Sequence, residues 1–380
     1  MGGCSSKNGV KTLDKSSRKE YDNSTETFKL KNGGNYVKRV SIKDVAREAG
    51  VAASTVSYVL NQKTTESISE ETQKRVLDAV KKLGYVPNLN ARSLSSNKSN
   101  LIGVLIPQTE PGREFMFSNP FYGELLSSIE YTARRNGYHL LLSGTEEDRD
   151  YLPVARNRGV DGIIIVGTYP GEHLNSLKSM NVPIVLVDSY VKDEAFHTIG
   201  IEDREGARMA TEHLIRKGHR QIAFISGSLR ENGVNIKRWQ GYCEAMRAAG
   251  LPVEEEAVYS GTVDYEYGIA AAEEYIRRGR KQTAAFVTAD VISMGVIKGL
   301  MSEGIRVPED FSLVSFDDVY LARMSYPSLT TVHQDIEEKG RLAVQLILDA
   351  AKASEHHHTE RILPLRLVVR DSVRERREQP

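Results

Sequence analysis

The chain has 380 residues, 40% of them hydrophobic and 27% charged, which is typical of a globular protein with a large core and two or three domains. No apolar run approaches the roughly 18 residues that span a bilayer, and no signal-peptide pattern opens the chain. Two cysteines are too few for a disulfide framework. We therefore expect a cytoplasmic protein with no membrane partner. The net charge is zero, but residues 1–98 carry +8 and the rest −8, which favours a polyanionic partner for the N-terminal part. Residues 1–39 supply +5 of this excess, so charge alone is weak evidence for nucleic-acid binding.

Residues 1–39 are predicted to form a disordered tail, because they are rich in Ser, Lys, Asn and Gly and poor in apolar side chains. Three short helices are expected after this tail. The first is bounded by Ser41-Ile-Lys-Asp44, which has the form of a capping box, and by Gly50, which supplies a left-handed stop. The second is expected from about Ser54 to Asn61, and the third from near Ser69 to Gly84.

From Leu101 onward, short apolar runs alternate with helical periods. Seven runs predict strands: Leu101–Ile106, His139–Leu142, Ile163–Val166, Ile184–Val187, Ile222–Ile225, Ala284–Thr288 and Leu313–Phe316. Five stretches between them predict helices: Leu125–Arg135, Ala207–Lys217, Arg238–Ala249, Ile269–Arg277 and Val296–Glu303. Strands without polar alternation, separated by helices, are typical of parallel sheets covered on both faces. We therefore expect an α/β fold with two doubly wound lobes, and a ligand cleft beyond the carboxyl ends of their strands.

The first two predicted helices have the spacing of a helix-turn-helix. Ala46 is small where the helices cross, Gly50 turns the chain, and Val56 enters the core of the bundle. In a helix-turn-helix the second helix enters the major groove of DNA while the first lies across the backbone. On spacing alone, an ordinary three-helix bundle is the alternative.

A set of longer motifs resembles the lactose-repressor/galactose-repressor (LacI/GalR) family of bacterial transcription regulators, from about Val40 to Ser372. The motifs are Ser41-Ile-Lys-Asp-Val-Ala-Arg-Glu-Ala-Gly-Val51, Ser54-Thr-Val-Ser57, Val59-Leu-Asn61, Tyr85-Val-Pro-Asn88, Ala91-Arg-Ser-Leu94, Asn119-Pro-Phe121, Gly218-His-Arg-Gln-Ile222, Arg238-Trp-Gln-Gly241, Ser315-Phe-Asp-Asp318 and Leu367-Val-Val-Arg370. The resemblance implies a helix-turn-helix DNA-binding domain at 40–87, a hinge at 88–99 and a two-lobed, periplasmic-binding-protein-like effector-binding and dimerisation domain at 100–372. Residues 373–380 are then a C-terminal tail.

The resemblance also implies which residues of the second helix contact DNA. Ala53, Ser54 and Tyr58 fall where the family's recognition helix meets base edges, since hydroxyls donate or accept and an alanine packs against a thymine methyl. Tyr58 departs from the Arg often found at its position; its alternative role is a surface aromatic packed on its own bundle. Thr55, Ser57 and Asn61 are expected to contact phosphates, which fix the register on the duplex.

Residues 88–98 have a faint helical pattern without a core of their own. By resemblance, this hinge becomes helical when two subunits lie side by side on DNA. Leu94 is then an apolar wedge in the minor groove, and Arg92 reaches a phosphate or the groove floor. A solvated linker is the alternative.

Four residues are implied to bind an effector in the cleft. Arg238 and Asp290 match positions that hold the small molecule in the family, and a guanidinium and a carboxylate suit a polyol. Phe121 and Tyr122 are expected to cover a sugar or purine face, with Phe121 the closer match to the motif. The alternatives are a helix cap for Asp290 and a surface salt bridge for Arg238.

Three further carboxylates also end predicted strands. We expect Asp317 and Asp318 to be more structural than functional, capping the next segment or supporting the hinge between the lobes. Asp188 has the same ambiguity between a ligand contact and a structural role.

One segment departs from the family pattern. The 11 residues Gln108–Ser118 replace about three, and Gln108 stands near a position where Asp is often found. Phe115, Met116 and Phe117 make a fully solvated loop less favourable. We expect the segment to fold over the ligand or extend the dimer interface, and an inert surface insertion is the alternative. Because Gln108 replaces the Asp often found near this position, no particular sugar specificity is carried over from the family.

An enzyme and a non-catalytic carbohydrate receptor are the competing interpretations. The sequence has no Walker loop, Gly-x-Gly-x-x-Gly, Gly-x-Ser-x-Gly or His-Glu-x-x-His motif, and nothing in it indicates a metal or another cofactor. We therefore expect a homodimeric transcriptional repressor that binds a near-palindromic double-stranded operator, lies on the nucleoid when bound, and responds to a small-molecule effector such as a sugar. A protein corepressor stays an open alternative.

Overall fold

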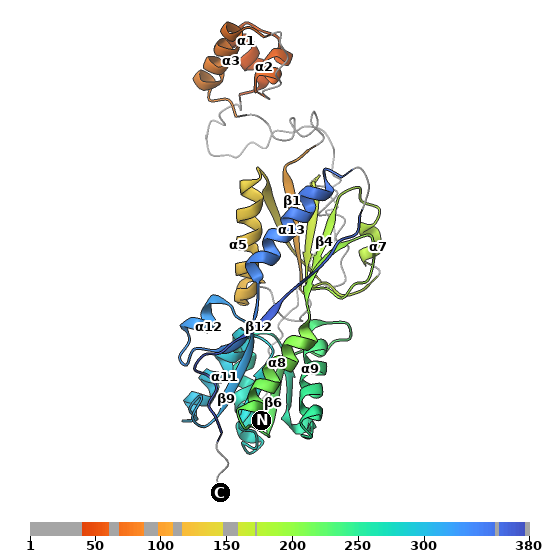
Figure 1. The fold of residues 1–380 in the computed structure, drawn as a ribbon. Coiled ribbons are helices and arrows are strands. Elements are labelled where there is room, and N and C mark those ends of the chain that lie inside the picture. Colours follow the sequence, from red (N-terminus) through yellow and green to blue (C-terminus); the bar gives the residue numbers. More distant parts are fainter. Residues whose placement is uncertain are drawn as a thin grey trace, which may run out of the picture. The chain divides into compact units, whose positions relative to one another are not determined.

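A computed structural model describes residues 40–60, 68–86, 98–108, 116–146, 159–171, 173–353 and 357–376. Contacts divide the chain into two compact units, residues 1–87 and 88–380, each considered by itself below (Figure 1). Among the described helices, none combines the length and the apolar character that crossing a membrane requires.

The described residues of the first unit, 40–60 and 68–86, form three helices: α1 (Ile42–Ala49), α2 (Ala53–Leu60) and α3 (Glu70–Leu83). The predicted capping box is confirmed, because the Ser41 N–H donates to Asp44 Oδ2 over 3.0 Å. Gly50 and Gly84 end α1 and α3 with φ of 66° and 61°, the left-handed conformation that glycine adopts at little cost. The three helices pack around a shared set of buried side chains, Val45, Ala46, Ala49, Val56, Val76 and Ala79.

The second unit consists of two lobes, each built on a six-stranded sheet. The sheet of the first lobe has the order β11-β5-β4-β3-β1-β2 and is parallel throughout. Its strands are β1 (Leu101–Gln108), β2 (His139–Glu146), β3 (Gly162–Val166), β4 (Ile184–Val187), β5 (His197–Ile201) and β11 (Glu360–Leu363). The sheet of the second lobe has the order β12-β10-β9-β8-β6-β7, with only β12 antiparallel. Its strands are β6 (Ile222–Gly227), β7 (Val258–Gly261), β8 (Ala284–Val287), β9 (Ser312–Asp317), β10 (Thr330–Gln334) and β12 (Leu365–Val368).

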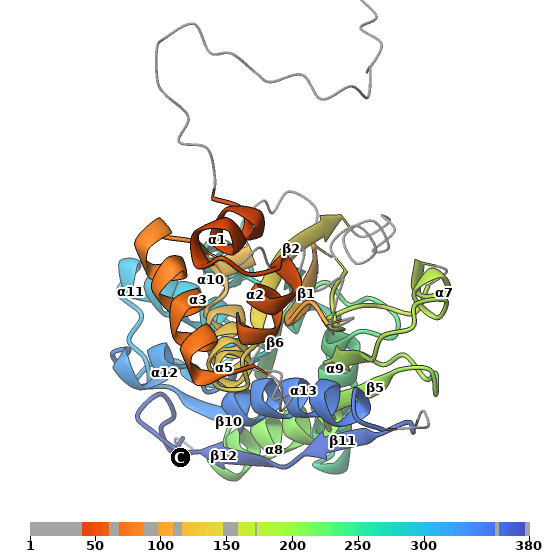
Figure 2. The ribbon, with the colours of Figure 1, turned by 90° about the horizontal axis from the view of Figure 1, so that it is seen from above.

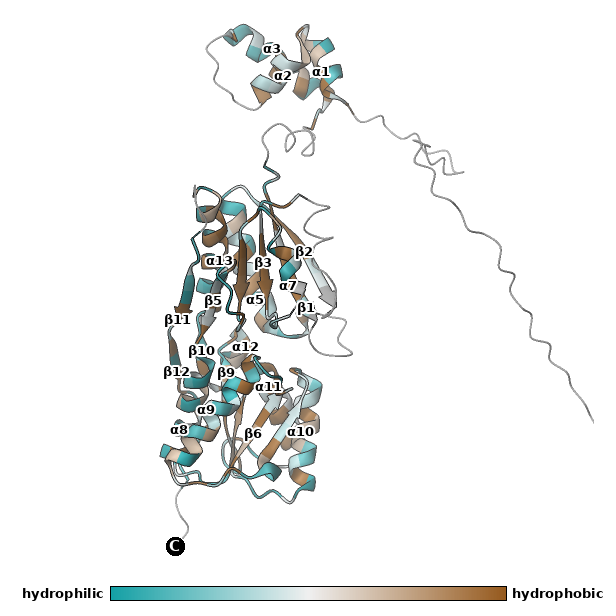
Figure 3. Cartoon of the chain, turned by 90° about the vertical axis from the view of Figure 1, so that its right-hand side faces the viewer, coloured by the Kyte–Doolittle hydropathy of each residue, from teal (hydrophilic) through white to brown (hydrophobic). Residues whose placement is uncertain are grey.

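Helices cover these sheets, as continuous apolar strands such as the fully buried β3 require (Figure 3). In the first lobe they are α5 (Pro120–Arg135), α7 (His173–Leu177) and α13 (Ile336–Ala350), preceded by the short 3₁₀ turn η1 (Met116–Ser118). In the second lobe they are α8 (Asp203–Arg216), α9 (Val234–Ala248), α10 (Tyr265–Arg277), α11 (Asp290–Ser302) and α12 (Tyr320–Met324), with the 3₁₀ turn η2 (Glu255–Ala257). One core cluster of the first lobe joins α5 and α13 to strands β1, β3 and β4.

The chain passes between the lobes three times. It leaves the first lobe after β5, returns between β10 and α13, and crosses again between β11 and β12. The last two strands follow each other along one side of the unit (Figure 2). These crossings place the carboxyl ends of both sets of parallel strands on the two sides of the region between the lobes.

Each of the seven predicted strands and five predicted helices overlaps an observed element, and where a predicted range runs past the end of its element it does so by one residue. The expectation of a two-lobed α/β fold with parallel sheets is confirmed, with the one antiparallel strand β12 as a difference. The prediction did not include β5, β7, β10, β11 or β12, nor the helices α7, α12 and α13.

Candidate functional site

The outward face of α2 carries the residues predicted to read DNA. Ser54 is exposed and Tyr58 is 45% exposed, one helical turn apart, while Val56 on the opposite face is fully buried. Ala53, Thr55 and Ser57 are half-buried. Tyr58 is therefore partly exposed on the surface of its bundle. Asn61, Arg92 and Leu94 lie outside the described residues.

A cavity of about 170 Å³ lies between the lobes of the second unit, far more than the roughly 15 Å³ that one water needs. The first lobe contributes Ile106, Pro107, Ser118, Asn119, Phe121, Tyr122, Val166, Gly167, Thr168, Tyr169 and Asp188. The second lobe and the crossing after β10 contribute Asn232, Gly233, Val234, Asn235, Arg238, Val263, Thr288, Ala289, Asp317 and Gln334. Most of these residues follow the carboxyl ends of strands, where open parallel sheets bind ligands.

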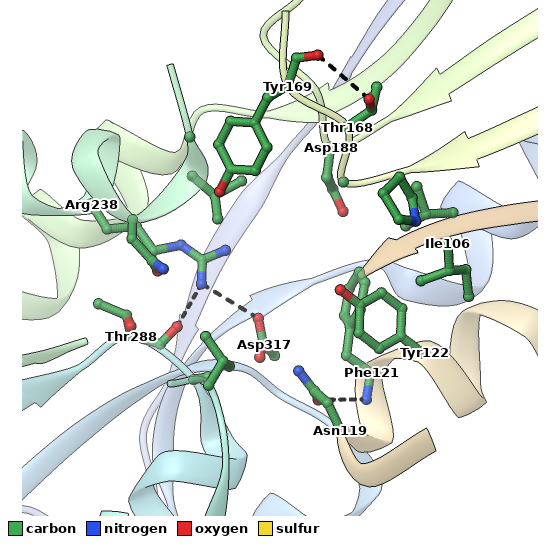
Figure 4. Close-up of a pocket in the computed structure, with 18 of the residues that line it drawn as sticks. Ile106, Asn119, Phe121, Tyr122, Thr168, Tyr169, Asp188, Arg238, Thr288 and Asp317 are labelled. Atoms are coloured by element: carbon green, nitrogen blue, oxygen red, sulfur yellow. Dashed lines mark hydrogen bonds and ion pairs between the residues drawn. The ribbon is translucent and has the colours of Figure 1, made fainter. Parts of the chain in front are cut away.

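Arg238 lies on the second-lobe side of the cavity, where dashed lines join its guanidinium to Thr288 and Asp317 (Figure 4). Its Nε donates to Asp203 Oδ1 over 2.8 Å and its Nη1 to the Thr288 carbonyl over 2.5 Å. The guanidinium lies 3.7 Å from the centre of the Phe316 ring. Burial lowers the pKa of Arg238, but the nearby Asp203 and Asp317 carboxylates outweigh it and raise that pKa overall. Arg238 thus stays charged and keeps donors on Nη1 and Nη2 for a ligand.

Asp317 and Asp188 bring carboxylates to the cavity from opposite lobes. Asp317 ends β9 with φ of 112°, and Asp188 follows β4 with φ of 51°, backbone conformations that often mark binding sites. Asp317 Oδ1 accepts from Gln334 Nε2 over 2.6 Å, and Asp188 Oδ1 accepts from Lys339 Nζ over 2.5 Å. Burial is the main cause that raises the pKa of Asp317 to about 7, against the lowering effect of Arg238.

The structure differs from the expectation that Asp290 would line the cavity. This carboxylate is fully buried in the first turn of α11, where Oδ2 accepts from the Val319 N–H over 2.9 Å and Oδ1 from Thr331 Oγ1 over 2.9 Å. Burial, and then the neighbouring Asp317, raise its pKa well above the usual value. Asp290 therefore lies behind the wall formed by Thr288 and Ala289, and ties α11 to the segments after β9 and in β10.

The aromatic residues predicted for the cleft do line the cavity. Phe121 and Tyr122 open α5, where Asn119 Oδ1 accepts from the Phe121 N–H over 3.0 Å and caps the helix. Their rings meet edge to face with centres 5.5 Å apart. Ser118, the last residue of the inserted segment Gln108–Ser118, also reaches the cavity, while Phe117 is 57% exposed. Residues 109–115, with Phe115, lie outside the described residues.

Several lining residues were not predicted. Asp318 behaves as expected, since Arg370 Nη2 donates to it over 2.6 Å and His333 Nδ1 lies 2.9 Å away, but Asp317 lines the cavity and was expected to be structural. The position of Asp188 and Asp317 at the ends of predicted strands was the available signal. Thr288 had the same signal, since it ends a predicted strand, and Asn119 stands in a quoted family motif. Tyr169, Asn232 and Gln334 had no such signal, because loops and the unpredicted strand β10 bring them to the cavity.

Comparisons with known proteins agree with this geometry. Residues 41–88 match the family described as bacterial regulatory proteins, lacI family, and residues 211–373 match the periplasmic binding protein-like domain. The catabolite control protein A of Priestia megaterium is 37% identical over 81% of this chain and 91% of its own length. The HTH-type transcriptional repressor PurR of Vibrio cholerae is 33% identical over 88% of this chain and 98% of its own length.

Solved structures of the same kind are similar over most of the chain. The lac repressor dimer bound to operator and an anti-inducer has 26% identity and a TM-score of 0.75, with 89% of this chain and all of that chain covered. The transcriptional regulator CelR in complex with cellobiose has 29% identity and a TM-score of 0.65, over 88% of this chain and all of that chain.

A helix-turn-helix unit combined with a two-lobed, periplasmic-binding-protein-like domain defines the class, a DNA-binding transcriptional regulator. More specifically, the chain belongs to the LacI family of bacterial regulatory proteins.

Proposed function

We propose that this regulator is a repressor that binds a near-palindromic operator as a homodimer and whose operator affinity is controlled by a neutral sugar in the interlobe cavity. The cavity carries the proposal: it combines two carboxylates and one guanidinium from opposite lobes with aromatic side chains. This is the chemistry that recognises hydroxyl groups and the apolar face of a sugar ring.

On the DNA side, the proposal assigns residues 40–87 to operator binding. Ser54 and Tyr58 contact base edges together with Ala53, while Thr55, Ser57 and Asn61 contact phosphates. The exposure of Ser54 and Tyr58 on one face of α2 supports this assignment. Residues 88–99 then form the hinge, with Leu94 as the minor-groove wedge and Arg92 beside it.

On the effector side, the proposal assigns Arg238, Phe121, Tyr122, Asp188 and Asp317 to ligand contacts. Among the described lining residues Arg238 is the one cation, and Asp203 and Thr288 already hold it. A phosphorylated ligand would bring one or two further negative charges toward Asp188 and Asp317, so the arrangement favours a neutral polyol. Among proteins with a similar structure, CelR is seen with cellobiose and an Enterococcus faecium regulator with ribose.

A second copy of the chain is the proposed partner of an apolar patch at α12. This patch consists of Tyr320, Met324 and Tyr326, which are 47%, 69% and 89% exposed. It lies beside α5, because the Tyr320 N–H donates to Glu124 Oε1 over 2.6 Å. Exposed apolar side chains of this size are typical of an interface, and the lac repressor structure named above is a dimer.

The DNA part of the proposal is tested by selecting duplexes from a random pool with the purified protein. We expect an enriched near-palindrome, and for Tyr58→Ala an affinity about tenfold lower on that sequence with a smaller loss on unrelated DNA. An enriched sequence without twofold symmetry would contradict the dimeric arrangement. Equal affinity of Tyr58→Ala for the selected duplex would remove Tyr58 from the base contacts.

The effector part is tested by thermal unfolding with a panel of ligands: ribose, cellobiose, their phosphorylated forms and a purine base. We expect a neutral sugar to raise the midpoint, because a ligand that binds only the folded state stabilises it. The gain should disappear in Arg238→Met. If only the phosphorylated forms or only the purine raised the unfolding midpoint, the effector would belong to that ligand class and would not be a neutral sugar.

A further inference from the structure

Lys339 is a buried cation that does not line the cavity. It lies in the first part of α13, and its side chain is fully buried. A buried ammonium is unfavourable unless acceptors surround it. Its Nζ donates to Asp188 Oδ1 over 2.5 Å and to Gln334 Oε1, and it lies 5.6 Å from the centre of the Phe121 ring. Three residues that line the cavity therefore surround this one ammonium.

Gln334 extends the effect of Lys339 to the second lobe. Its amide oxygen accepts from Lys339, so its Nε2 is directed to Asp317 Oδ1, over 2.6 Å. Asp188 follows β4 of the first lobe, and Asp317 ends β9 of the second. The ammonium thus holds one carboxylate directly and the other through the Gln334 amide, at the crossing between β10 and α13.

The carboxylate oxygens that remain available point to the ligand chemistry. Within the described part of the chain, the contacts with Lys339, Gln334 and Arg238 use only Oδ1 of Asp188 and of Asp317. Above about pH 7, where Asp317 is ionised, Oδ2 of each carboxylate is then an acceptor on its own side of the cavity. A ligand with hydroxyl groups at both ends satisfies both acceptors at once, whereas a ligand with a single hydroxyl satisfies one.

We infer that Lys339 is a positioning residue that sets the specificity of the cavity, by holding Asp188 and Asp317 as paired acceptors for two hydroxyl groups of one neutral ligand. This inference rests on the proposed effector function of the cavity. Lys339, although it does not line the cavity, then determines how well the cavity distinguishes polyols that differ by one hydroxyl group.

The test compares the wild type with Lys339→Met, which keeps the length of the side chain and removes the ammonium. Calorimetry measures the affinity for the neutral sugar, ribose or cellobiose, that binds the wild type more tightly, and for its monodeoxy analogues. We expect Lys339→Met to bind the parent sugar about tenfold more weakly or worse, the value of a charge-assisted hydrogen bond. Lys352→Met removes an exposed lysine just beyond the same helix and should leave the affinity unchanged.

The ratio between parent sugar and deoxy analogue separates positioning from a structural role. In the wild type, at least one analogue should bind about tenfold more weakly than the parent, because a carboxylate loses its donor. In Lys339→Met the affinities for the parent sugar and its deoxy analogue should differ by no more than about twofold, since the carboxylate acceptor is no longer held in place. A merely structural lysine would lower the unfolding midpoint and leave the ratio as in the wild type.

Each result decides the inference. An unchanged ratio in Lys339→Met, with sugar binding retained, overturns the inference and leaves the proposed function intact. If the wild type binds neither sugar, the proposed sugar effector fails and the inference falls with it. If circular dichroism shows that Lys339→Met does not fold, the same binding ratio is measured for Lys339→Gln, which fills the site without a charge. That ratio then decides the inference.

Discussion

Single residues around the cavity carry charges that depend on one another. Arg238 is bonded to Asp203 and lies 3.8 Å from Asp317, and Tyr190 donates to the other oxygen of Asp203 over 2.7 Å. Because these groups are buried, removing one partner leaves another charge without compensation, which costs more than the bond itself contributes. The charge state of the cavity is therefore a property of the whole group, within which burial raises the pKa of Asp317 to about 7.

Asp317→Asn should change the pH dependence of stability. Burial raises the pKa of Asp317 to about 7 from 3.8, so between these values the folded state holds a proton that the unfolded state has released. Its contribution to stability is thus complete below about pH 4 and is lost as the pH rises through about 7. Relative to the wild type, Asp317→Asn should therefore gain stability as the pH rises from about 4 to about 7, with no further gain above that range, measured by urea unfolding.

Arg238, Lys339, Asp188 and Gln334 face Asp317 and are present in both proteins. The difference between the two pH profiles therefore reports the titration of Asp317. Asparagine keeps an acceptor for Gln334 and tolerates a positive φ. Parallel pH profiles for the two proteins would show that Asp317 is ionised throughout this range.

Among the elements, the contact between α5 and α13 links the cavity to the rest of the first lobe. α5 begins with Phe121 at the cavity, and α13 carries Lys339 beneath it. The two helices approach closely at Gly340, where an added Cβ would lie 2.7 Å from Cβ and Oγ of Ser128. Ser128 Oγ donates to the Glu337 carbonyl over 2.6 Å across the same contact. A helix pair this close leaves little room for one helix to move without the other.

Gly340→Ala should separate these helices. We expect a loss of about 1–3 kcal/mol in the free energy of unfolding, because the methyl group overpacks the contact by more than the better helix propensity of alanine offsets. Gly200→Ala in β5 is the control, since its Cβ would meet Ile362 Cδ1 at 3.9 Å, an ordinary contact. Both variants are compared by denaturant unfolding. Equal stability of Gly340→Ala and the wild type would mean that the contact relaxes at no cost.

At the scale of the whole molecule, the three crossings between the lobes make the cavity a joint property of both sheets. Lining residues come from nearly every strand end on the facing sides, although they are up to 228 positions apart in the chain, from Ile106 to Gln334. Regulation of DNA affinity by such a cavity requires a second element with two arrangements, and the subunit interface is the one that the apolar patch at α12 suggests.

Met324→Glu should weaken the proposed dimer. Met324 is 69% exposed in the patch with Tyr320 and Tyr326, and a twofold interface would bring two copies of the new carboxylate into one apolar contact. We expect a shift toward monomer in sedimentation velocity and a lower operator affinity. Met301→Glu, at a half-exposed methionine near the end of α11, should leave the association state unchanged. If Met324→Glu stays as associated as the wild type, the interface lies elsewhere.

Local patterns were sufficient for the elements with strong periodicity or caps. The three helices of the first unit follow from the capping box at Ser41, the stops at Gly50 and Gly84, and inward residues such as Val56. The central strands follow from apolar runs that only a covered parallel sheet accommodates. By contrast, β5 alternates buried and half-buried residues over five positions, and β11 is largely exposed at a sheet edge, so neither presents an apolar run.

The sequence by itself determined the fold class, the positions of α1 to α3 and the candidates Arg238, Phe121 and Tyr122, since short-range periodicity and contiguous motifs carry that information. Only the tertiary structure decided that Asp317 and Asp188 line the cavity, that Asp290 lies behind its wall, and that Lys339 holds the carboxylates. The reason is physical: burial and hydrogen bonding of a carboxylate depend on partners such as Thr331 and Lys339, which lie 41 and 151 positions away along the chain. The type of a residue and its neighbours along the chain do not identify partners that are so distant in the sequence.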